Sequence, residues 1–281
     1  MSSPMQKRVL VVEDEAPMRE VVADILVAEG LTVVCAGTGT QALQHLQTET
    51  FDLVVLDVGL PDMNGLDILA RLPKGPEAPR VVVVTGDQTH ATLLRAVREQ
   101  AYSYLTKPYP AETLLKVVRD ALAAPAEPPI EVLSAKPEWV ELLVPCSRDA
   151  AERIQSFMLQ LRADLSDEVR ESVGYAFHEL LLNAVEWGGG LDPQRRVRIA
   201  YLRTRRMLQY RIADPGPGFH FDGLKHAALS NPPEDPVHHL QARAAKGLRP
   251  GGLGILMVRA LADELLYNEA QNEVMFVKYL D

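Results

Sequence analysis

The sequence predicts two folds joined in one chain: a doubly wound α/β domain with a five-stranded parallel sheet, and then an α+β sandwich. The first half alternates short β-branched runs with amphipathic stretches, the pattern of a parallel sheet covered on both faces. In the second half, clustered helical patterns are followed by strands, which favours antiparallel strands packed against helices. A length of 281 residues is sufficient for two domains of typical size.

Five apolar runs of the first half are expected to form its strands. They are Val9–Val12, Val33–Val34, Leu53–Leu56, Val81–Val84 and Tyr104–Leu105. Helical patterns lie between them at Pro17–Glu29, Thr40–Gln47 and Thr89–Gln100, and a last helix is expected from Ala111 to about Ala124. Prolines then stiffen the chain and prevent the helix from continuing. We therefore predict a domain at 1–124, a linker at 125–130 and a second domain at 131–281.

The second domain is expected to begin with a strand at Val140–Val144, followed by helices at Ser147–Leu161 and Asp167–Glu186. Strands are expected at Val197–Leu202 and Leu208–Ala213, then an irregular stretch from Pro215 to Arg249. A helix from about Leu253 to Leu266 and a strand from Glu273 to Leu280 complete the prediction.

Composition restricts the compartment and the partners. The formal net charge of -9 disfavours duplex DNA, because phosphate binding needs a positive surface. Cys35 and Cys146 are the two cysteines, have no metal-ligand spacing and fit a reducing compartment. Residues 1–8 contain no apolar segment of a signal peptide, and no apolar run approaches the roughly 20 residues of a membrane-spanning helix. We therefore expect a cytoplasmic protein with no nucleic-acid partner and no membrane partner.

The predicted strand ends of the first domain carry acidic, hydroxyl and amino groups. Glu13 and Asp14 follow the first strand, and Asp57, Thr85 and Lys107 end or follow later ones. The carboxyl ends of these strands share one edge of the sheet, where ligands bind in doubly wound folds. Three clustered carboxylates favour Mg²⁺, and Asp57 can accept a phosphoryl group as a nucleophile. The ammonium of Lys107 and the hydroxyl of Thr85 are suited to the phosphoryl oxygens.

With these residues, the first domain resembles the receiver domain of response regulators, which has a flavodoxin-like fold. The matching residues are Glu13-Asp14, Asp57, Thr85-Gly86 and Lys107-Pro108. The resemblance implies that Asp14, Asp57 and the carbonyl of Gly59 ligate the metal, while Glu13 helps through water. It also implies that an upstream sensor histidine kinase supplies the phosphoryl group to Asp57.

Two further properties follow from the receiver resemblance. The Lys107–Pro108 bond is expected to be cis. Tyr104, three residues before the lysine, matches the aromatic switch position that turns inward when Thr85 follows the phosphoryl group. A half-buried tyrosine on an edge strand is the alternative interpretation.

Three segments of the second domain are suited to a nucleotide. Glu179 and Asn183 share one face of a predicted helix. The segment Asp214–Gly218 places an acid and two glycines after a strand, so that a ligand can approach the backbone. The segment Gly251–Gly254 opens a helix whose first amides can face phosphate oxygens. Each alone is a weak signal, because a polar helix face and glycine turns are common.

In this order and spacing, the segments resemble the GHKL (Bergerat-fold) ATP-binding domain, in the branch of anti-sigma-factor serine kinases. The resemblance implies that Asn183 coordinates Mg²⁺, that Glu179 polarises the attacking hydroxyl, and that Asp214 accepts a hydrogen bond from the adenine amino group. The glycines implied to shape the pocket are Gly216, Gly218, Gly252 and Gly254. Members of this branch often pair, so a homodimer is expected.

Two features depart from the family pattern. Trp187 stands where a small residue or a histidine is usual. The segment 219–250 is longer than the usual lid and contains four histidines, which suggests a lid with incidental histidines rather than a zinc site. His178 precedes Glu179, but its place in the nucleotide-site helix favours a packing or surface role over that of a phosphorylated histidine.

The two resemblances predict a response regulator in which phosphorylation of Asp57 controls an ATP-binding output domain. The first hypothesis is a serine/threonine protein kinase that acts on an anti-sigma-factor antagonist. The alternative is a non-catalytic, nucleotide-dependent partner switch that sequesters a sigma factor or another regulator. A DNA-binding output is disfavoured by the acidic charge and by the lack of a helix-turn-helix pattern.

Overall fold

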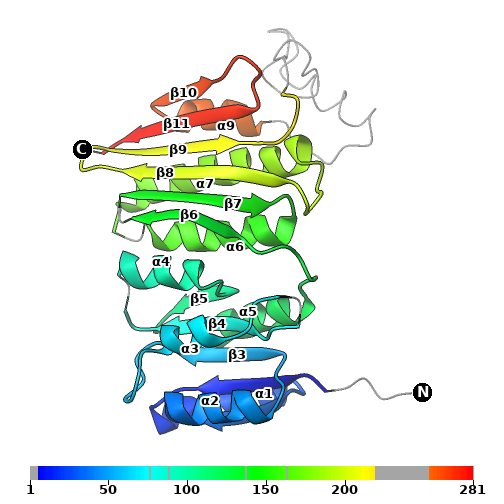
Figure 1. The fold of residues 1–281 in the computed structure, drawn as a ribbon. Helices are drawn as coiled ribbons and strands as arrows, with labels where there is room; N and C mark the ends of the chain where they lie inside the picture. The colour runs from blue at the N-terminus through cyan, green and yellow to red at the C-terminus, as the bar shows by residue number, and fades with distance from the viewer. Residues whose placement is uncertain are drawn as a thin grey trace. The chain divides into compact units, whose positions relative to one another are not determined.

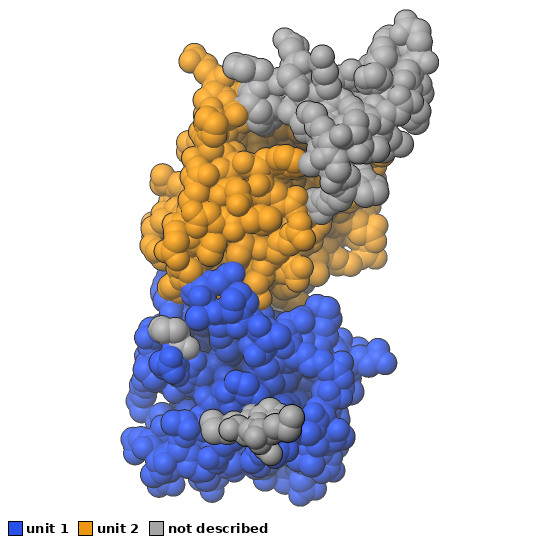
Figure 2. Space-filling model, turned by 90° about the vertical axis from the view of Figure 1, so that its right-hand side faces the viewer, with its two compact units in different colours: residues 1–127 blue, residues 128–281 orange. Residues whose placement is uncertain are grey.

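The computed structural model describes residues 6–75, 77–87, 89–136, 138–162, 164–218 and 253–280. The chain forms two compact units, residues 1–127 and 128–281 (Figure 2). Each unit has its own sheet (Figure 1). Within the described ranges, no helix combines the length and the apolar character needed to cross a membrane.

The first unit is a five-stranded parallel sheet, as predicted, and its strand order is β2-β1-β3-β4-β5 (Figure 1). The strands are β1 (Arg8–Val12), β2 (Thr32–Ala36), β3 (Leu53–Asp57), β4 (Arg80–Thr85) and β5 (Ser103–Thr106). The helices are α1 (Ala16–Ala28), α2 (Gly39–Thr48), α3 (Gly65–Arg71), α4 (His90–Arg98) and α5 (Ala111–Ala123). The central strand β3 is buried along its whole length because helices cover both faces of the sheet.

Helix α2 begins where two side chains satisfy its free amides. Thr38 precedes the helix and accepts a hydrogen bond from the amide of Gln41 at 3.2 Å. The carboxylate of Asp62, from the loop after β3, accepts from the amides of Gly39 and Thr40 at 2.8 Å each. This carboxylate fixes the loop after β3 to the start of α2, which favours negative charge.

The second unit is a six-stranded antiparallel sheet with the order β10-β11-β9-β8-β7-β6. The strands are β6 (Glu131–Lys136), β7 (Trp139–Pro145), β8 (Arg196–Arg203), β9 (Met207–Ala213), β10 (Glu264–Tyr267) and β11 (Glu273–Tyr279). The helices are α6 (Arg148–Gln160), α7 (Asp167–Asn183) and α9 (Gly254–Leu261). Phe177 of α7 packs on Tyr210 of β9, with ring centroids 5.0 Å apart, so the core lies between helices and sheet.

Three elements differ from the sequence prediction. The helix expected from about Leu253 to Leu266 ends at Leu261, because Ala262 is extended and the chain turns into the edge strand β10. The other edge strand, β6, was not predicted, since its residues are exposed or half-buried and lack an apolar run. Helix α7 ends at Asn183 and continues as a π-helical turn, η1 (Ala184–Gly188), rather than as α-helix to Glu186.

Candidate functional site

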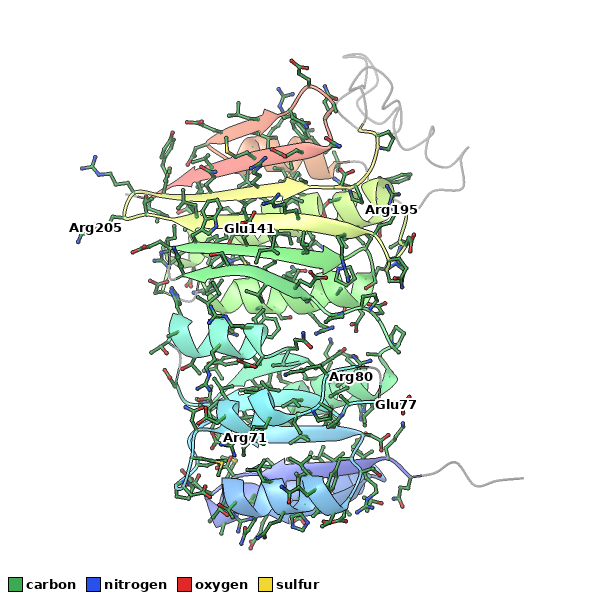
Figure 3. The ribbon with its side chains drawn as sticks, in the orientation of Figure 1. Arg71, Glu77, Arg80, Glu141, Arg195 and Arg205 are labelled. Carbon is green, nitrogen blue, oxygen red and sulfur yellow. The ribbon has the colours of Figure 1, made fainter. Side chains whose placement is uncertain are left out.

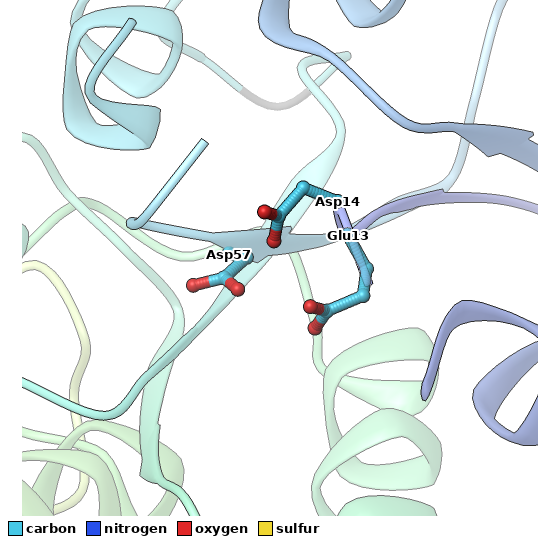
Figure 4. Close-up of side chains that lie close together, drawn as sticks. All are labelled: Glu13, Asp14 and Asp57. Atoms are coloured by element: carbon cyan, nitrogen blue, oxygen red, sulfur yellow. The ribbon is translucent and has the colours of Figure 1, made fainter. Parts of the chain in front are cut away.

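The parallel pairing of β1 with β3 brings three carboxylates of the first unit together. Val12 pairs with Leu56, so the residues that follow each strand end at the same edge of the sheet. Oxygens of Glu13, Asp14 and Asp57 lie within 4.8 Å of one another, and Figure 4 shows the three carboxylates facing a common space. Glu13 and Asp57 are buried, whereas Asp14 is exposed.

The ammonium of Lys107 links two of these carboxylates. Its Nζ lies 2.7 Å from Oε2 of Glu13 and 2.6 Å from Oδ2 of Asp57. Burial alone would lower the pKa of Lys107, but the hydrogen bonds to the two carboxylates raise it above its ordinary value. For Glu13, burial raises the pKa, and the hydrogen bond from Lys107 offsets part of that rise. The Lys107–Pro108 bond is cis, as the resemblance implies.

The acid cluster fits a hard divalent cation. Oε1 of Glu13 is buried and has no hydrogen-bond partner among the described residues, so one anionic oxygen is left to bind a ligand. Three carboxylates converge but one ammonium faces them, which leaves a surplus of negative charge. Oxygen ligands with this charge suit Mg²⁺. The amide of Gly59 donates to Oδ1 of Asp57 at 3.0 Å and orients that carboxylate.

Thr85 and Tyr104 are connected through the backbone of one residue. The hydroxyl of Thr85 accepts a hydrogen bond from the amide of Asp87 at 3.0 Å. The carbonyl of Asp87 accepts from the hydroxyl of Tyr104 at 2.5 Å. Tyr104 is 6% exposed, so its ring is buried rather than half-buried at the edge of the sheet. A displacement of the Thr85 hydroxyl therefore acts on the loop that holds Tyr104.

Two residues of this site were not predicted. A Cβ at Gly65 would overlap the backbone carbonyl of Asp57, so a glycine is needed where α3 begins. Arg19 of α1 donates from Nη1 to the carbonyls of Glu13 and Asp14, at 2.6 and 3.2 Å, and supports the acidic loop. The pair Asn64-Gly65 before an apolar helical pattern is a sequence signal for the first of them, because asparagine is a favourable N-cap.

In the second unit, the predicted pair Glu179 and Asn183 lies on α7, and Glu179 contacts the first residue of α9. A Cβ at Gly254 would overlap Oε2 of Glu179. The start of α9 therefore faces the carboxylate without a side chain between them. Gly252, which was predicted to shape the same loop, lies outside the described residues.

Asp214 lies at the end of β9 in a crowded turn. Its Oδ1 accepts a hydrogen bond from the amide of Gly216 at 2.8 Å. A Cβ at Gly188 would overlap the carboxylate, so η1 approaches Asp214 as closely as a glycine allows. Burial raises the pKa of Asp214, with the Gly216 amide and the charge of Arg195 opposing the rise. The carboxylate is therefore held in place by backbone contacts.

The turn after β9 is supported by the connection between β10 and β11. Nδ2 of Asn272 donates to the carbonyl of Gly216 at 3.0 Å, and the amide of Asp214 donates to the carbonyl of Asn272 at 2.8 Å. Gly218 has a φ of 82° and lies against the backbone of Ala270. This support was not predicted, because the contacts join residues that are far apart in sequence.

Arg195 supports the same turn from the segment before β8. Its side chain is labelled in Figure 3. The Nη2 atom donates to the carbonyl of Pro215 at 2.6 Å. No pattern in the sequence indicates this contact.

The residues that departed from the family pattern are placed as follows. His178 contacts Oε1 of Gln155 on α6 through Nδ1 at 2.6 Å, which is a helix–helix packing position. Trp187 lies in η1 and is 55% exposed. The four histidines of the segment 219–250 lie outside the described residues.

Both units match known families. Residues 9–119 match the response regulator receiver domain, and residues 146–278 match the histidine kinase-like ATPase domain. The DNA-binding response regulator MtrA of Mycolicibacterium paratuberculosis is 30% identical over 184 residues, which cover 66% of this chain and 80% of that protein. The chemotaxis protein CheY of Bacillus subtilis is 29% identical over 119 residues, which cover 42% of this chain and 99% of that protein.

Among solved structures, a CheY-like receiver domain protein from Methanospirillum hungatei matches with 29% identity and a TM-score of 0.39. It covers 42% of this chain and 94% of that one. The sequence matches and the parallel sheet identify the first unit, and the ATPase match identifies the second. The chain therefore belongs to the response-regulator family, with an N-terminal receiver domain and a C-terminal histidine kinase-like ATPase domain.

Proposed function

We propose that phosphorylation of Asp57 controls an output domain that binds ATP with Mg²⁺ and phosphorylates a serine or threonine of an anti-sigma-factor antagonist. One observation carries the kinase part of the proposal: the Glu179 carboxylate lies against Gly254 at the start of α9. A base beside the first amides of a helix is suited to a hydroxyl that attacks a phosphate bound at those amides.

In the receiver domain, an oxygen of Asp57 attacks the phosphorus of a phosphohistidine on the sensor kinase. The new O–P bond forms as the N–P bond breaks, and the histidine ring leaves with the bonding electrons. Asp14, Asp57 and the carbonyl of Gly59 are proposed to hold Mg²⁺, with Glu13 acting through water; the ion neutralises phosphoryl charge when bound. Lys107, already beside Asp57, then pairs with a phosphoryl oxygen.

The phosphoryl group changes the contacts of Thr85. It carries about -1.5 to -2 charges and replaces the single charge of the Asp57 carboxylate, and the Thr85 hydroxyl turns toward it. The amide of Asp87 then loses the acceptor it now has at 3.0 Å. Since Asp87 also accepts from Tyr104, the ring of Tyr104 is released to a second position. Such a two-state loop is what a phosphorylation switch requires.

In the output domain, the oxygen of the substrate hydroxyl attacks the γ-phosphorus of ATP while Glu179 accepts the hydroxyl proton. ADP then leaves with the electrons of the broken P–O bond. Asn183 is proposed to hold Mg²⁺, which would neutralise phosphate charge when bound. Asp214 accepts a hydrogen bond from the adenine amino group. The glycines proposed to shape the pocket are Gly216, Gly218, Gly252 and Gly254.

The proposed domains are the receiver at 1–124, the linker at 125–130 and the ATPase-type domain at 131–281. In support, the division between the compact units falls at Glu127 and Pro128, within the proposed linker. We propose that this linker transmits the receiver switch and that the output domain forms a homodimer. The partners proposed are the sensor histidine kinase and the anti-sigma-factor antagonist, or in the alternative a sigma factor.

The direct test is transfer of labelled phosphate from ATP to candidate antagonist proteins, with and without beryllofluoride, a mimic of phosphorylated aspartate. Label should appear with the native protein and disappear in Glu179→Gln and Asn183→Ala. His178→Ala is the matched control, because His178 adjoins Glu179 but contacts Gln155. Nucleotide binding without transfer to any candidate would contradict the kinase and support the partner switch.

The same protein should be tested against promoter DNA, because the MtrA relatives are named as DNA-binding. We expect no specific shift in electrophoretic mobility, since the net charge is -9 and residues 146–278 match an ATPase-type domain. A specific shift at physiological salt would overturn this part of the proposal.

A further inference from the structure

A buried arginine of the second unit has no acidic partner among the described residues. Arg162 follows α6 and is 0% exposed. Its Nε donates to the carbonyl of Met158 in the last turn of α6 at 2.9 Å. Both terminal nitrogens are buried, and within the described ranges neither makes a hydrogen bond of good geometry, although the Tyr210 hydroxyl lies near enough to interact with the guanidinium. Because a guanidinium stays protonated in proteins, this core position carries a full positive charge.

Two tyrosine hydroxyls lie near this guanidinium. Tyr201 of β8 pairs directly with Tyr210 of β9, and their ring centroids are 4.9 Å apart. Both hydroxyls are buried, and neither makes a hydrogen bond of good geometry in the described part of the chain; Arg203 lies near the Tyr201 hydroxyl and Arg162 near that of Tyr210. Burial raises the pKa of both tyrosines, and the charge of Arg162 is close enough to oppose the rise. Three buried side chains whose polar atoms lack well-formed hydrogen bonds therefore meet in one place.

The charges around the cluster do not balance. Arg203, the other arginine near Tyr201, donates from its two terminal nitrogens to the two oxygens of Asp164 at 2.8 and 2.7 Å. That carboxylate is thus committed to Arg203, and Arg162 remains in surplus. The partial negative charge at the end of α6 offsets only part of a full charge. An unpaired buried charge costs several kcal/mol, so the surplus calls for a counter-charge.

The hydrogen-bond donors also exceed the acceptors. The terminal nitrogens of Arg162 carry four N–H groups, and the two tyrosines carry two O–H groups. The acceptors within these three side chains are the two phenol oxygens. A water molecule adds donors as well as acceptors and brings no charge. An anion only accepts, and it corrects both imbalances together.

Burial restricts the size of that anion. Arg162 is fully enclosed, and Gly174 of α7 adds no side chain: a Cβ there would lie 3.9 Å from Nη1 of Arg162. We propose that a monovalent anion of chloride size binds among Arg162, Tyr201 and Tyr210 beneath α7. The anion stabilises the packing of α7, which carries Glu179 and Asn183, on the sheet. The inference is independent of the proposed kinase activity.

The test uses the full chain and its own tryptophans. Both tryptophans, Trp139 and Trp187, lie in the second unit, so their fluorescence reports on its unfolding. Sodium chloride is exchanged for sodium gluconate at constant sodium concentration, because gluconate is too large for the site. The unfolding midpoint should rise with chloride and saturate, by about 3 to 5 °C at ten times the dissociation constant.

Variants separate a bound ion from a general salt effect. Arg162→Met, which replaces the charge with an apolar chain of similar length, should remove the chloride dependence. Tyr210→Phe and Tyr201→Phe should each raise the half-saturating chloride concentration, about five- to tenfold for one lost hydrogen bond. Tyr267→Phe, a tyrosine of the edge strand β10, is the matched control and should leave it unchanged.

Crystals grown with bromide give a direct readout that does not depend on the folding of a variant. The expected result is an anomalous peak in hydrogen-bond range of the Arg162 nitrogens and of one tyrosine hydroxyl. The absence of that peak, or an unfolding midpoint equal in chloride and gluconate, would overturn the proposal. So would a chloride dependence that survives in Arg162→Met.

Discussion

Glu179 and Gly254 are in such close contact that no side chain fits between the carboxylate and the start of α9. Gly254→Ala should therefore displace the Glu179 carboxylate. We expect kcat/KM for phosphate transfer to fall about 100-fold, because a displacement near 1 Å has an effect of this order. The fold should survive, since alanine favours a helix.

The measurement for this variant is phosphate transfer, alongside circular dichroism. Leu256→Ala changes the same helix at a side chain that is 42% exposed, and serves as the control. Unchanged transfer in Gly254→Ala would refute the role given to this contact.

Gly65→Ala should disturb the receiver site by displacing the backbone of Asp57. The added Cβ would overlap the backbone carbonyl of Asp57, so the phosphorylated residue must shift. We expect the free energy of unfolding to fall by about 1–3 kcal/mol, as for overpacked cores, and beryllofluoride binding to weaken. Urea unfolding followed by circular dichroism measures the first effect. Gly86→Ala is the matched control, because a Cβ at Gly86 meets nothing within 4 Å; an equal loss there would contradict the explanation.

Lys107→Met should leave two buried carboxylates without their common cation. We expect the free energy of unfolding at pH 7 without Mg²⁺ to fall by about 3 kcal/mol, as when one partner of a buried ion pair is removed. Added Mg²⁺ should restore part of the loss. Lys116→Met removes an exposed ammonium paired with Asp120 and should change stability by less than about 0.5 kcal/mol. The measurement is urea unfolding with and without Mg²⁺. A free energy of unfolding that does not change in Lys107→Met would contradict the role of Lys107 as the common cation of the two carboxylates.

Asp62→Asn should change how the receiver responds to acid. Hydrogen bonds from Thr40 and Gly39 lower the pKa of Asp62 to about 2. Because the pKa of Asp62 is lower in the folded state, its carboxylate stabilises the fold at a pH above 3.8, the pKa of the unfolded state. This stabilisation is lost as the pH falls toward 2. The native protein should therefore have the higher unfolding temperature at pH 7, and the difference should shrink in acid. A difference that stays constant down to pH 2 would contradict this account.

Acid should weaken ATP binding through Asp214. Burial raises the pKa of this carboxyl, so it becomes protonated at a higher pH than an ordinary aspartate and then no longer accepts from adenine. When the pKa of a group is higher in the folded state, the group stabilises the fold at any pH below its pKa in the unfolded state. This stabilisation is lost as the pH rises through the pKa in the folded state. Asp214→Asn should thus bind ATP weakly at pH 7 yet unfold at a higher temperature. Calorimetric titration from pH 8 to pH 4.5 tests the first effect, and an affinity that does not change would contradict it.

The parallel sheet and its acidic edge were predictable because apolar strands alternate with helical patterns, and Glu13, Asp57 and Lys107 follow strand ends. Edge strands such as β6 were not, since an exposed strand carries no apolar run. The contact of Asn272 with the turn after Asp214 could also not be predicted from the sequence, because the contact depends on which strands, distant in sequence, pair with each other. The surplus charge of Arg162 cannot be seen in a sequence, where an arginine after a helix is ordinarily a surface residue.

The neighbouring positions of β9 and β11 have a consequence for protein engineering. Ala213, the last residue of β9, pairs with Glu273, the first residue of β11, so the two ends of the connection 214–272 lie side by side. This connection contains α9 and β10. Because the entropy of closing a loop grows slowly with its length, the connection should tolerate the insertion of a reporter between residues 219 and 250, ahead of the glycine segment that begins at Gly251. This stretch is the natural entry point for a sensor that reports nucleotide occupancy.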